Sequence, residues 1–96
     1  MNRFRLQLLG GFELRSPAGD RLRLPTRKAE ALLGYLALAK SVAQQRETLV
    51  GLLWSEAPDG AGLASLRQCL SLIGKTCGEA VFTTLGRGLL LEADRF

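Results

Sequence analysis

The triplet Gly74-Lys75-Thr76 has the residue types that end a phosphate-binding loop, in which backbone N–H groups and a lysine hold the phosphates of a nucleotide. That loop follows the pattern G-x-x-x-x-G-K-[ST], and its first glycine forms the turn on which the N–H groups converge. Cys69 occupies this first position, and the intervening LSLI at residues 70–73 continues an apolar helical stripe. The triplet therefore ends a helix where the motif would begin one, and we expect no nucleotide site here.

Residue types that carry catalysis or bind metals are few in this chain. It contains no histidine, which excludes Ser-His and Cys-His nucleophile pairs, and its nine carboxylates are scattered over polar or loop positions. Its two cysteines, Cys69 and Cys77, lie eight positions apart in one predicted helix, roughly 12 Å at the helical rise per residue, which is too far for a disulfide. They are also too few for a zinc site, so we interpret them as buried structural thiols. We predict a protein that is not an enzyme, with no catalytic residue, metal, cofactor or small-molecule substrate.

Length and charge limit the possible partners. The 96 residues fit a single domain, 1–96, and an apolar content of 47% is typical of a chain that folds. The formal charge of +4 favours an anionic partner such as nucleic acid, although soluble proteins without such a partner also carry this excess. No apolar run reaches the length of a membrane span, and the first residues lack the pattern of a signal peptide. We expect a cytoplasmic protein without a membrane partner.

Residues 4–24 alternate apolar and polar side chains, which is the periodicity of β-strands. The glycines at 10 and 11 interrupt the first alternating stretch as a turn or bulge. SPAGD at residues 16–20 has the proline, glycine and aspartate of a hairpin loop. These signals predict a small N-terminal sheet of short antiparallel strands.

Helical periodicity replaces the alternation after residue 25. Thr26 is placed to cap a first helix that runs to Ala39, and residues 46–54 fit a shorter second helix. APDGAG at residues 57–62 then breaks the chain before a third helix over residues 63–77.

The second and third helices each show an apolar face, and Gly78 is suited to end the third. The residues that we place toward the core are Leu49, Leu52 and Leu53 in the second helix and Leu63, Leu66, Leu70, Ile73 and Cys77 in the third. The opposite face of the third helix carries polar side chains that can donate hydrogen bonds to phosphates or base edges, namely Gln68, Ser71 and Lys75, with Arg67 at its edge. Residues 63–78 contain no acidic residue that would repel DNA.

Residues 80–84 and 89–92 flank Gly86-Arg87-Gly88 as a hairpin with one positive charge at its turn. Three helices followed by a hairpin form the winged-helix arrangement, in which the third helix enters a major groove and the hairpin touches an adjacent groove. We therefore predict an α+β fold: a winged helix with a three-helix helix-turn-helix core, an N-terminal antiparallel β-sheet and a C-terminal β-hairpin wing. The recognition helix would span about 63–77 and the wing about 80–92.

Several stretches resemble one family of DNA-binding domains. LPTRKAEALLGYLAL at 24–38, LVGLLW at 49–54 and ASLRQCLSLI at 64–73 are similar to the OmpR/PhoB-type winged-helix domain at the N-terminus of SARP-type bacterial transcriptional regulators. The opening LQLLGGFELR and the closing TTLGRGLLLEADRF are similar to it too, so the resemblance covers nearly the whole chain. It implies a four-stranded N-terminal sheet, three helices and a wing. It also implies sequence-specific binding of double-stranded DNA at repeated sites, contact with RNA polymerase, and a longer regulator of which this chain is the N-terminal part.

The resemblance also gives individual residues a role. Arg67 and Gln68 match a Leu-Arg-Gln segment of the recognition helix, and Trp54 matches an aromatic residue that approaches the backbone phosphates at the end of helix two. Arg87 matches the wing tip, where a guanidinium can enter the minor groove. The candidate DNA-binding residues are Arg67, Gln68, Ser71, Lys75, Arg87 and Trp54.

Some of these residues also have a purely structural interpretation. Trp54 can close the edge of the core beside helix three, and the helix dipole alone favours Lys75 near a helix C-terminus. Arg87 can be a simple exposed turn residue, and Arg27-Lys28 can simply solvate the start of helix one.

The third helix departs from the family in its second half. Related recognition helices continue with further arginines or lysines where this chain has Leu72, Ile73 and Gly74, and only Lys75 is basic. Glycine inside a helix costs about 1 kcal/mol relative to alanine, so we expect the last turn to fray or to end early. An exposed Leu72 would fit contact with a thymine methyl or with another protein.

Two functional hypotheses result. The first is sequence-specific DNA binding in bacterial transcription regulation. The alternative is a degenerate winged helix that acts as a protein-interaction or dimerisation module in a larger regulator, for which self-association is expected. A nucleotide-dependent enzyme ranks last.

Overall fold

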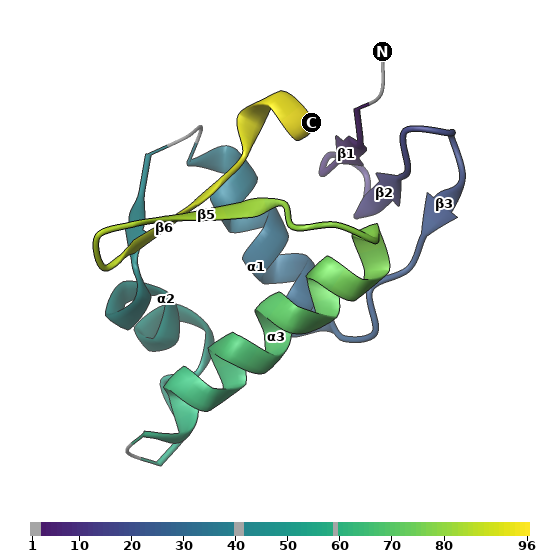
Figure 1. Cartoon of the computed structure of the whole chain (residues 1–96). Helices are drawn as coiled ribbons and strands as arrows, with labels where there is room; N and C mark the ends of the chain where they lie inside the picture. Colours follow the sequence, from purple (N-terminus) through teal and green to yellow (C-terminus); the bar gives the residue numbers. More distant parts are fainter. Residues whose placement is uncertain (1–2, 40–41, 59) are drawn as a thin grey trace.

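The fold combines three helices with two small antiparallel sheets. The computed structural model describes residues 3–39, 42–58 and 60–96. Asp59, which belongs to the predicted break at 57–62, lies outside the described residues. Figure 1 shows α3 crossing the near side of α1, with the hairpin of β5 and β6 above it and the N-terminal sheet beside them. The elements are β1 Arg5–Gln7, β2 Glu13–Arg15, β3 Arg21–Leu22, α1 Arg27–Leu38, β4 Gln44–Gln45, α2 Arg46–Leu53, α3 Ala61–Cys77, β5 Phe82–Leu85, β6 Gly88–Leu91 and the 3-10 turn η1 Ala93–Arg95.

The N-terminal sheet has the order β1-β2-β3, and the central residue of its middle strand is buried. Leu14 pairs with Leu6 on one side and with Leu22 on the other, and its side chain is fully buried. Gly10 and Gly11 take positive φ values of 78° and 120° between β1 and β2, a backbone conformation that glycine adopts without strain. The short antiparallel strands predicted for residues 4–24 and the glycine turn between the first two are confirmed. The four strands implied by the family resemblance are not, because this sheet has three strands in the part of the chain that the structure describes.

Local capping sets the ends of α1 and α3. The Thr26 hydroxyl accepts a hydrogen bond from the Ala29 N–H at 3.1 Å, as predicted for the cap of α1. Gly78 ends α3 in the left-handed conformation with φ 76°, and its N–H donates to the Gly74 carbonyl at 2.9 Å. Because α3 continues without interruption through Gly74 to Cys77, the expectation that it ends early is wrong.

The buried face of α3 overlaps with the predicted one at Leu66 and Ile73 but is centred on a different side of the helix. Its buried residues are Gly62, Leu66, Cys69 and Ile73, whereas Leu63 is 37% exposed and Leu70 and Cys77 are half-buried. In α2, Leu49 is buried but Leu52 is 55% exposed. The two helices approach closely at Gly62, which has no side chain and faces Val50, and Leu63 and Leu52 lie outside this buried contact.

The two cysteines are free, and they differ in burial. Cys69 is 4% exposed and faces the core, and burial raises the pKa of its thiol. Cys77 is only half-buried, yet desolvation and the nearby Glu79 carboxylate raise its pKa to about 11. Both thiols therefore stay protonated near neutral pH, which makes them unreactive.

The wing belongs to a second sheet with the order β4-β6-β5. β5 and β6 form the predicted hairpin around Gly86 and Arg87, whereas Gly88 is already part of β6. β4 was not predicted, because two glutamines carry no strand periodicity, and it pairs Gln44 with Leu89 on the inner edge of the wing. In the described ranges, no helix is both long and apolar enough to cross a membrane.

Candidate nucleic-acid interface

The four polar residues predicted for the outer face of α3 do lie together there. Arg67, Gln68, Ser71 and Lys75 are all exposed, opposite the buried residues of the same helix. At 100° per residue, Ser71 and Lys75 lie near the middle of the exposed arc, with Arg67 on one flank and Gln68 on the other. The exposed face of α3 therefore carries a hydrogen-bonding side chain on each flank, and we call these the Arg67 flank and the Gln68 flank.

Gly62 fixes the position of α3 relative to α2. A Cβ built on Gly62 would overlap the Val50 side chain and lie 3.7 Å from the Trp54 Cβ. Any larger residue at this crossing would require the Val50 side chain or α2 itself to shift. Close contact between these two helices sets the angle at which α3 projects from the domain.

Trp54 is half-buried where α2 ends, beside the Gln68 flank of α3. A hollow of about 210 Å³ separates the two, and its described lining includes Lys28, Ser65 and Leu72. Lys28 lies with its ammonium 5.6 Å from the centre of the Trp54 ring, and it also donates a hydrogen bond to the Leu53 carbonyl. Leu72, whose exposure the sequence left open, is half-buried against this hollow.

Arg87 is exposed at the turn of the wing, and the unpredicted residue Arg46 supports it. From the first turn of α2, the Arg46 guanidinium donates to the Arg87 carbonyl and to the Thr84 hydroxyl, each at 3.3 Å. Together with the pairing of β4 and β6, these bonds connect the wing tip to the start of α2. Sequence reasoning missed Arg46, because its partners lie 41 and 38 positions away along the chain.

Loss of the Arg46 guanidinium should loosen the wing tip. Arg46→Met keeps a long side chain but removes both bonds, and we expect amide hydrogen exchange at residues 84–88 to accelerate by about tenfold, as for two weak hydrogen bonds that together contribute about 1.4 kcal/mol. Exchange in the core of α1 should not change. Arg46→Lys keeps the charge but lacks the planar guanidinium that reaches both acceptors, so it should also accelerate exchange. Equal protection in wild type and Arg46→Met would show that β4 alone holds the wing.

The cations near this surface are not neutralised by close carboxylates. In the described part of the chain, ion pairs within 4.0 Å involve Arg15 with Glu13 and Arg95 with Glu79 and Glu92. None involves the basic residues around α3 and the wing, which are Lys28, Arg46, Arg67, Lys75 and Arg87. Their positive charge therefore remains available to an anionic partner.

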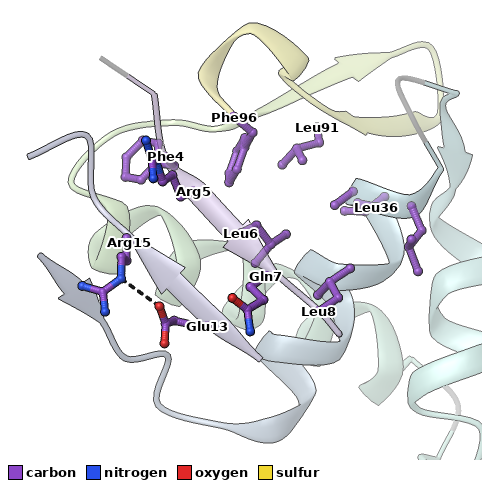
Figure 2. A pocket seen from close by; sticks show the side chains of 12 residues that line it. Phe4, Arg5, Leu6, Gln7, Leu8, Glu13, Arg15, Leu36, Leu91 and Phe96 are labelled. Carbon is purple, nitrogen blue, oxygen red and sulfur yellow. Dashed lines mark hydrogen bonds and ion pairs between the residues drawn. The ribbon is translucent and has the colours of Figure 1, made fainter. Parts of the chain in front are cut away.

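A larger hollow lies elsewhere, between the N-terminal sheet and α1. This cleft of about 730 Å³ is lined by β1, β2, the C-terminal half of α1, Leu91 and Phe96. Figure 2 shows apolar side chains such as Leu6, Leu8 and Leu36 around it and the ion pair of Arg15 with Glu13 at its rim. None of its described lining residues belongs to α3, so the cleft is separate from the surface above. Sequence reasoning missed it, because it forms where distant segments meet.

The fold is similar to that of a known protein. A solved structure of Mycobacterium tuberculosis EmbR in complex with a low-affinity phosphopeptide matches 95% of this chain with a TM-score of 0.76 at 23% sequence identity. The match covers 25% of the EmbR chain, so this chain spans about a quarter of the length of that protein. Neither a protein-family model nor a curated protein matches the sequence. The likeness establishes the predicted α+β winged-helix fold.

Proposed function

We propose that this chain is the sequence-specific DNA-binding domain of a SARP-type bacterial transcription regulator, acting in the cytoplasm. One observation carries the proposal: the outer face of α3 exposes four hydrogen-bonding residues and no acid, while the Arg87 wing tip adds a further exposed cation. An α-helix has the diameter that the major groove of B-DNA admits. RNA polymerase as a second partner rests on the family resemblance and on the fold that supports it.

The residues of the proposed interface divide into base readers and phosphate binders. On the flanks of α3, Arg67 is suited to bidentate hydrogen bonds with guanine, and Gln68 is suited to bidentate hydrogen bonds with adenine. Ser71, which lies between them, can form hydrogen bonds with several base edges. Lys75, in the last turn, suits a phosphate. Arg87 would enter the minor groove and Trp54 would approach the backbone, both at the border of the helix site.

The basic residues that the third helix lacks have a structural counterpart outside it. Ile73 is fully buried, so a charge at that position would have to leave water at a large cost. Lys28 and Arg46 supply cations from neighbouring elements instead. Part of the positive charge beside α3 and the wing therefore lies at the start of α1 and of α2.

A second candidate function is a protein-contact module, and the apolar cleft of Figure 2 favours it. Leu38 lines this cleft and is 69% exposed, which makes it suited to contact with a second copy or another protein. Loss of a self-associated state in Leu38→Lys with unchanged DNA affinity would favour this candidate.

Titration against DNA at several salt concentrations tests the proposal. DNA should bind most tightly at low salt, and sites enriched from a random-sequence library should bind more tightly than mixed sequence. Lys75→Ala and Arg87→Ala should each reduce the slope of log affinity against log salt by about one, because each removes one cation that releases counterions from DNA. Fluorescence anisotropy of labelled duplexes measures both quantities. A wild-type domain without measurable DNA affinity at low salt would overturn the proposal.

A further inference from the structure

We propose that Lys28 is a phosphate-binding residue, positioned by the C-terminal end of α2 and the Trp54 ring, and that it contacts the DNA strand along the Gln68 flank of α3. The inference rests on the proposed DNA binding and goes beyond it, because no resemblance or residue pattern gives Lys28 a role. From sequence it had only the role of solvating the start of a helix.

The position of Lys28 is fixed from two sides. Its ammonium donates to the carbonyl of Leu53, the last residue of α2, and lies 5.6 Å from the centre of the Trp54 ring. The negative end of the α2 dipole and the face of the indole both attract a cation. An ammonium has three N–H donors, and the bond to Leu53 uses one of them. A lysine held in this way loses less side-chain entropy on binding an anion than a mobile surface lysine would.

The surroundings of the ammonium suit an anion. The described lining of the hollow includes the donors Thr26, Ser65 and Gln68, and it includes no carboxylate. Lys28 itself is exposed, so an anion can reach it from solvent. The Thr26 hydroxyl already caps α1 through the Ala29 N–H, which leaves the ammonium as the main charge at this point.

The location relative to α3 points to DNA phosphate as the anion. A helix of about 10–12 Å diameter fills the major groove, about 12 Å wide, from wall to wall. Groups that stand next to the flanks of the helix therefore meet the phosphates of the two strands. On the Gln68 flank, the neighbouring group is the Lys28 and Trp54 pair, which shares the hollow with Gln68.

The contrasting interpretation is that Lys28 only stabilises the end of α2. Lys28→Gln separates the two, because glutamine retains a donor for the Leu53 carbonyl but carries no charge. Lys28→Met, which keeps an alkyl stem over Trp54, serves as a second neutral variant should the first fail to fold. Lys28→Arg keeps the charge. Arg5→Met is a matched control, since it removes one exposed charge from β1 on the cleft side of the domain.

The experiment measures the affinity of wild type and variants for one duplex between 50 and 200 mM salt. We expect Lys28→Gln to reduce the salt slope by about one, so that its affinity falls about threefold less than that of wild type over this range. Lys28→Arg and Arg5→Met should retain the wild-type slope. The chain has a single tryptophan, so a change of Trp54 emission on DNA binding reports contact at this place directly.

The outcomes separate the two proposals. Wild type that binds DNA while Lys28→Gln keeps the full slope would overturn the role of Lys28 and leave DNA binding intact. Wild type that does not bind DNA would overturn both. A lower melting temperature of Lys28→Gln with an unchanged slope would identify Lys28 as a purely structural residue of α2.

Discussion

Replacing Gly62 with alanine should lower the free energy of unfolding by about 1–3 kcal/mol, the usual cost of overpacking a core. The added Cβ would overlap the Val50 side chain across the contact of α2 and α3. Val50 cannot easily turn away, because a β-branched residue in a helix strongly prefers one rotamer. The helices must separate instead, which would also displace the Trp54 Cβ at 3.7 Å. For a domain of this size, each kcal/mol corresponds to about 4–8 °C in melting temperature.

Two other helical glycines provide matched controls. A Cβ on Gly51 in α2 meets no atom within 4 Å, and one on Gly74 in α3 comes no closer than 3.9 Å to the Glu79 carbonyl oxygen. Gly51→Ala and Gly74→Ala should therefore each stabilise the domain by about 1 kcal/mol, the helix propensity gained. Thermal or urea unfolding followed by circular dichroism measures all three variants.

A second substitution, at Val50, tests whether overlap with the Val50 side chain causes the loss of stability in Gly62→Ala. Val50→Ala alone removes half-buried methyl groups and should cost about 1 kcal/mol. In the double variant Val50→Ala with Gly62→Ala, the overlap is gone, so the combined loss should be smaller than the two single losses added together. Additive losses would show that Gly62 acts through its own backbone rather than through contact with Val50.

The elements that the sequence predicts well are those with a local cause. Thr26 caps α1 because its hydroxyl reaches the N–H three residues on, and Gly78 ends α3 because glycine accepts a positive φ. The hairpin turns around Gly86 for the same reason, with φ 61°. Such causes act within a few residues, so they can be recognised without knowledge of the fold.

The errors concern which face of a helix is buried. Periodicity places Leu63 and Leu66 on one apolar stripe, and it does not say where the centre of that stripe meets the core. The buried face of α3 is centred on Gly62, Leu66, Cys69 and Ile73, so Leu66 is buried and Leu63 lies at the edge. A glycine opposite a valine on another helix is a property of the assembled fold, which a single helix cannot reveal.

The candidate interface shows the same division between local and long-range causes. The outer residues of α3 follow from one helical period and were predicted together. Lys28 and Arg46 were not, because their partners, the end of α2 and the wing turn, are distant in sequence and adjacent only after folding. Both are cations on neighbouring elements that border the predicted site, a position that becomes visible only in three dimensions.

Substitution of Arg67 should have the largest effect on sequence discrimination. In the proposed complex its guanidinium bonds to two acceptors of one guanine, an arrangement worth about 1–3 kcal/mol, or roughly 5- to 150-fold in affinity. Arg67→Lys keeps the charge but loses the planar fork. We therefore expect Arg67→Lys to weaken binding to sites enriched by the wild-type domain and to leave the salt slope and the affinity for mixed sequence nearly unchanged.

Comparison of Arg67→Lys with Lys75→Ala, which removes a phosphate contact, tests whether Arg67 reads a base. Lys75→Ala should weaken binding to selected and mixed sequences alike, whereas Arg67→Lys should reduce only the difference between them. Repeating the selection with Arg67→Lys should relax the preference at one base pair, because a single bidentate contact specifies a single guanine. If Arg67→Lys instead keeps the wild-type preference at every position, Arg67 is not a base reader, and the sequence information must come from the Gln68 flank or from DNA shape.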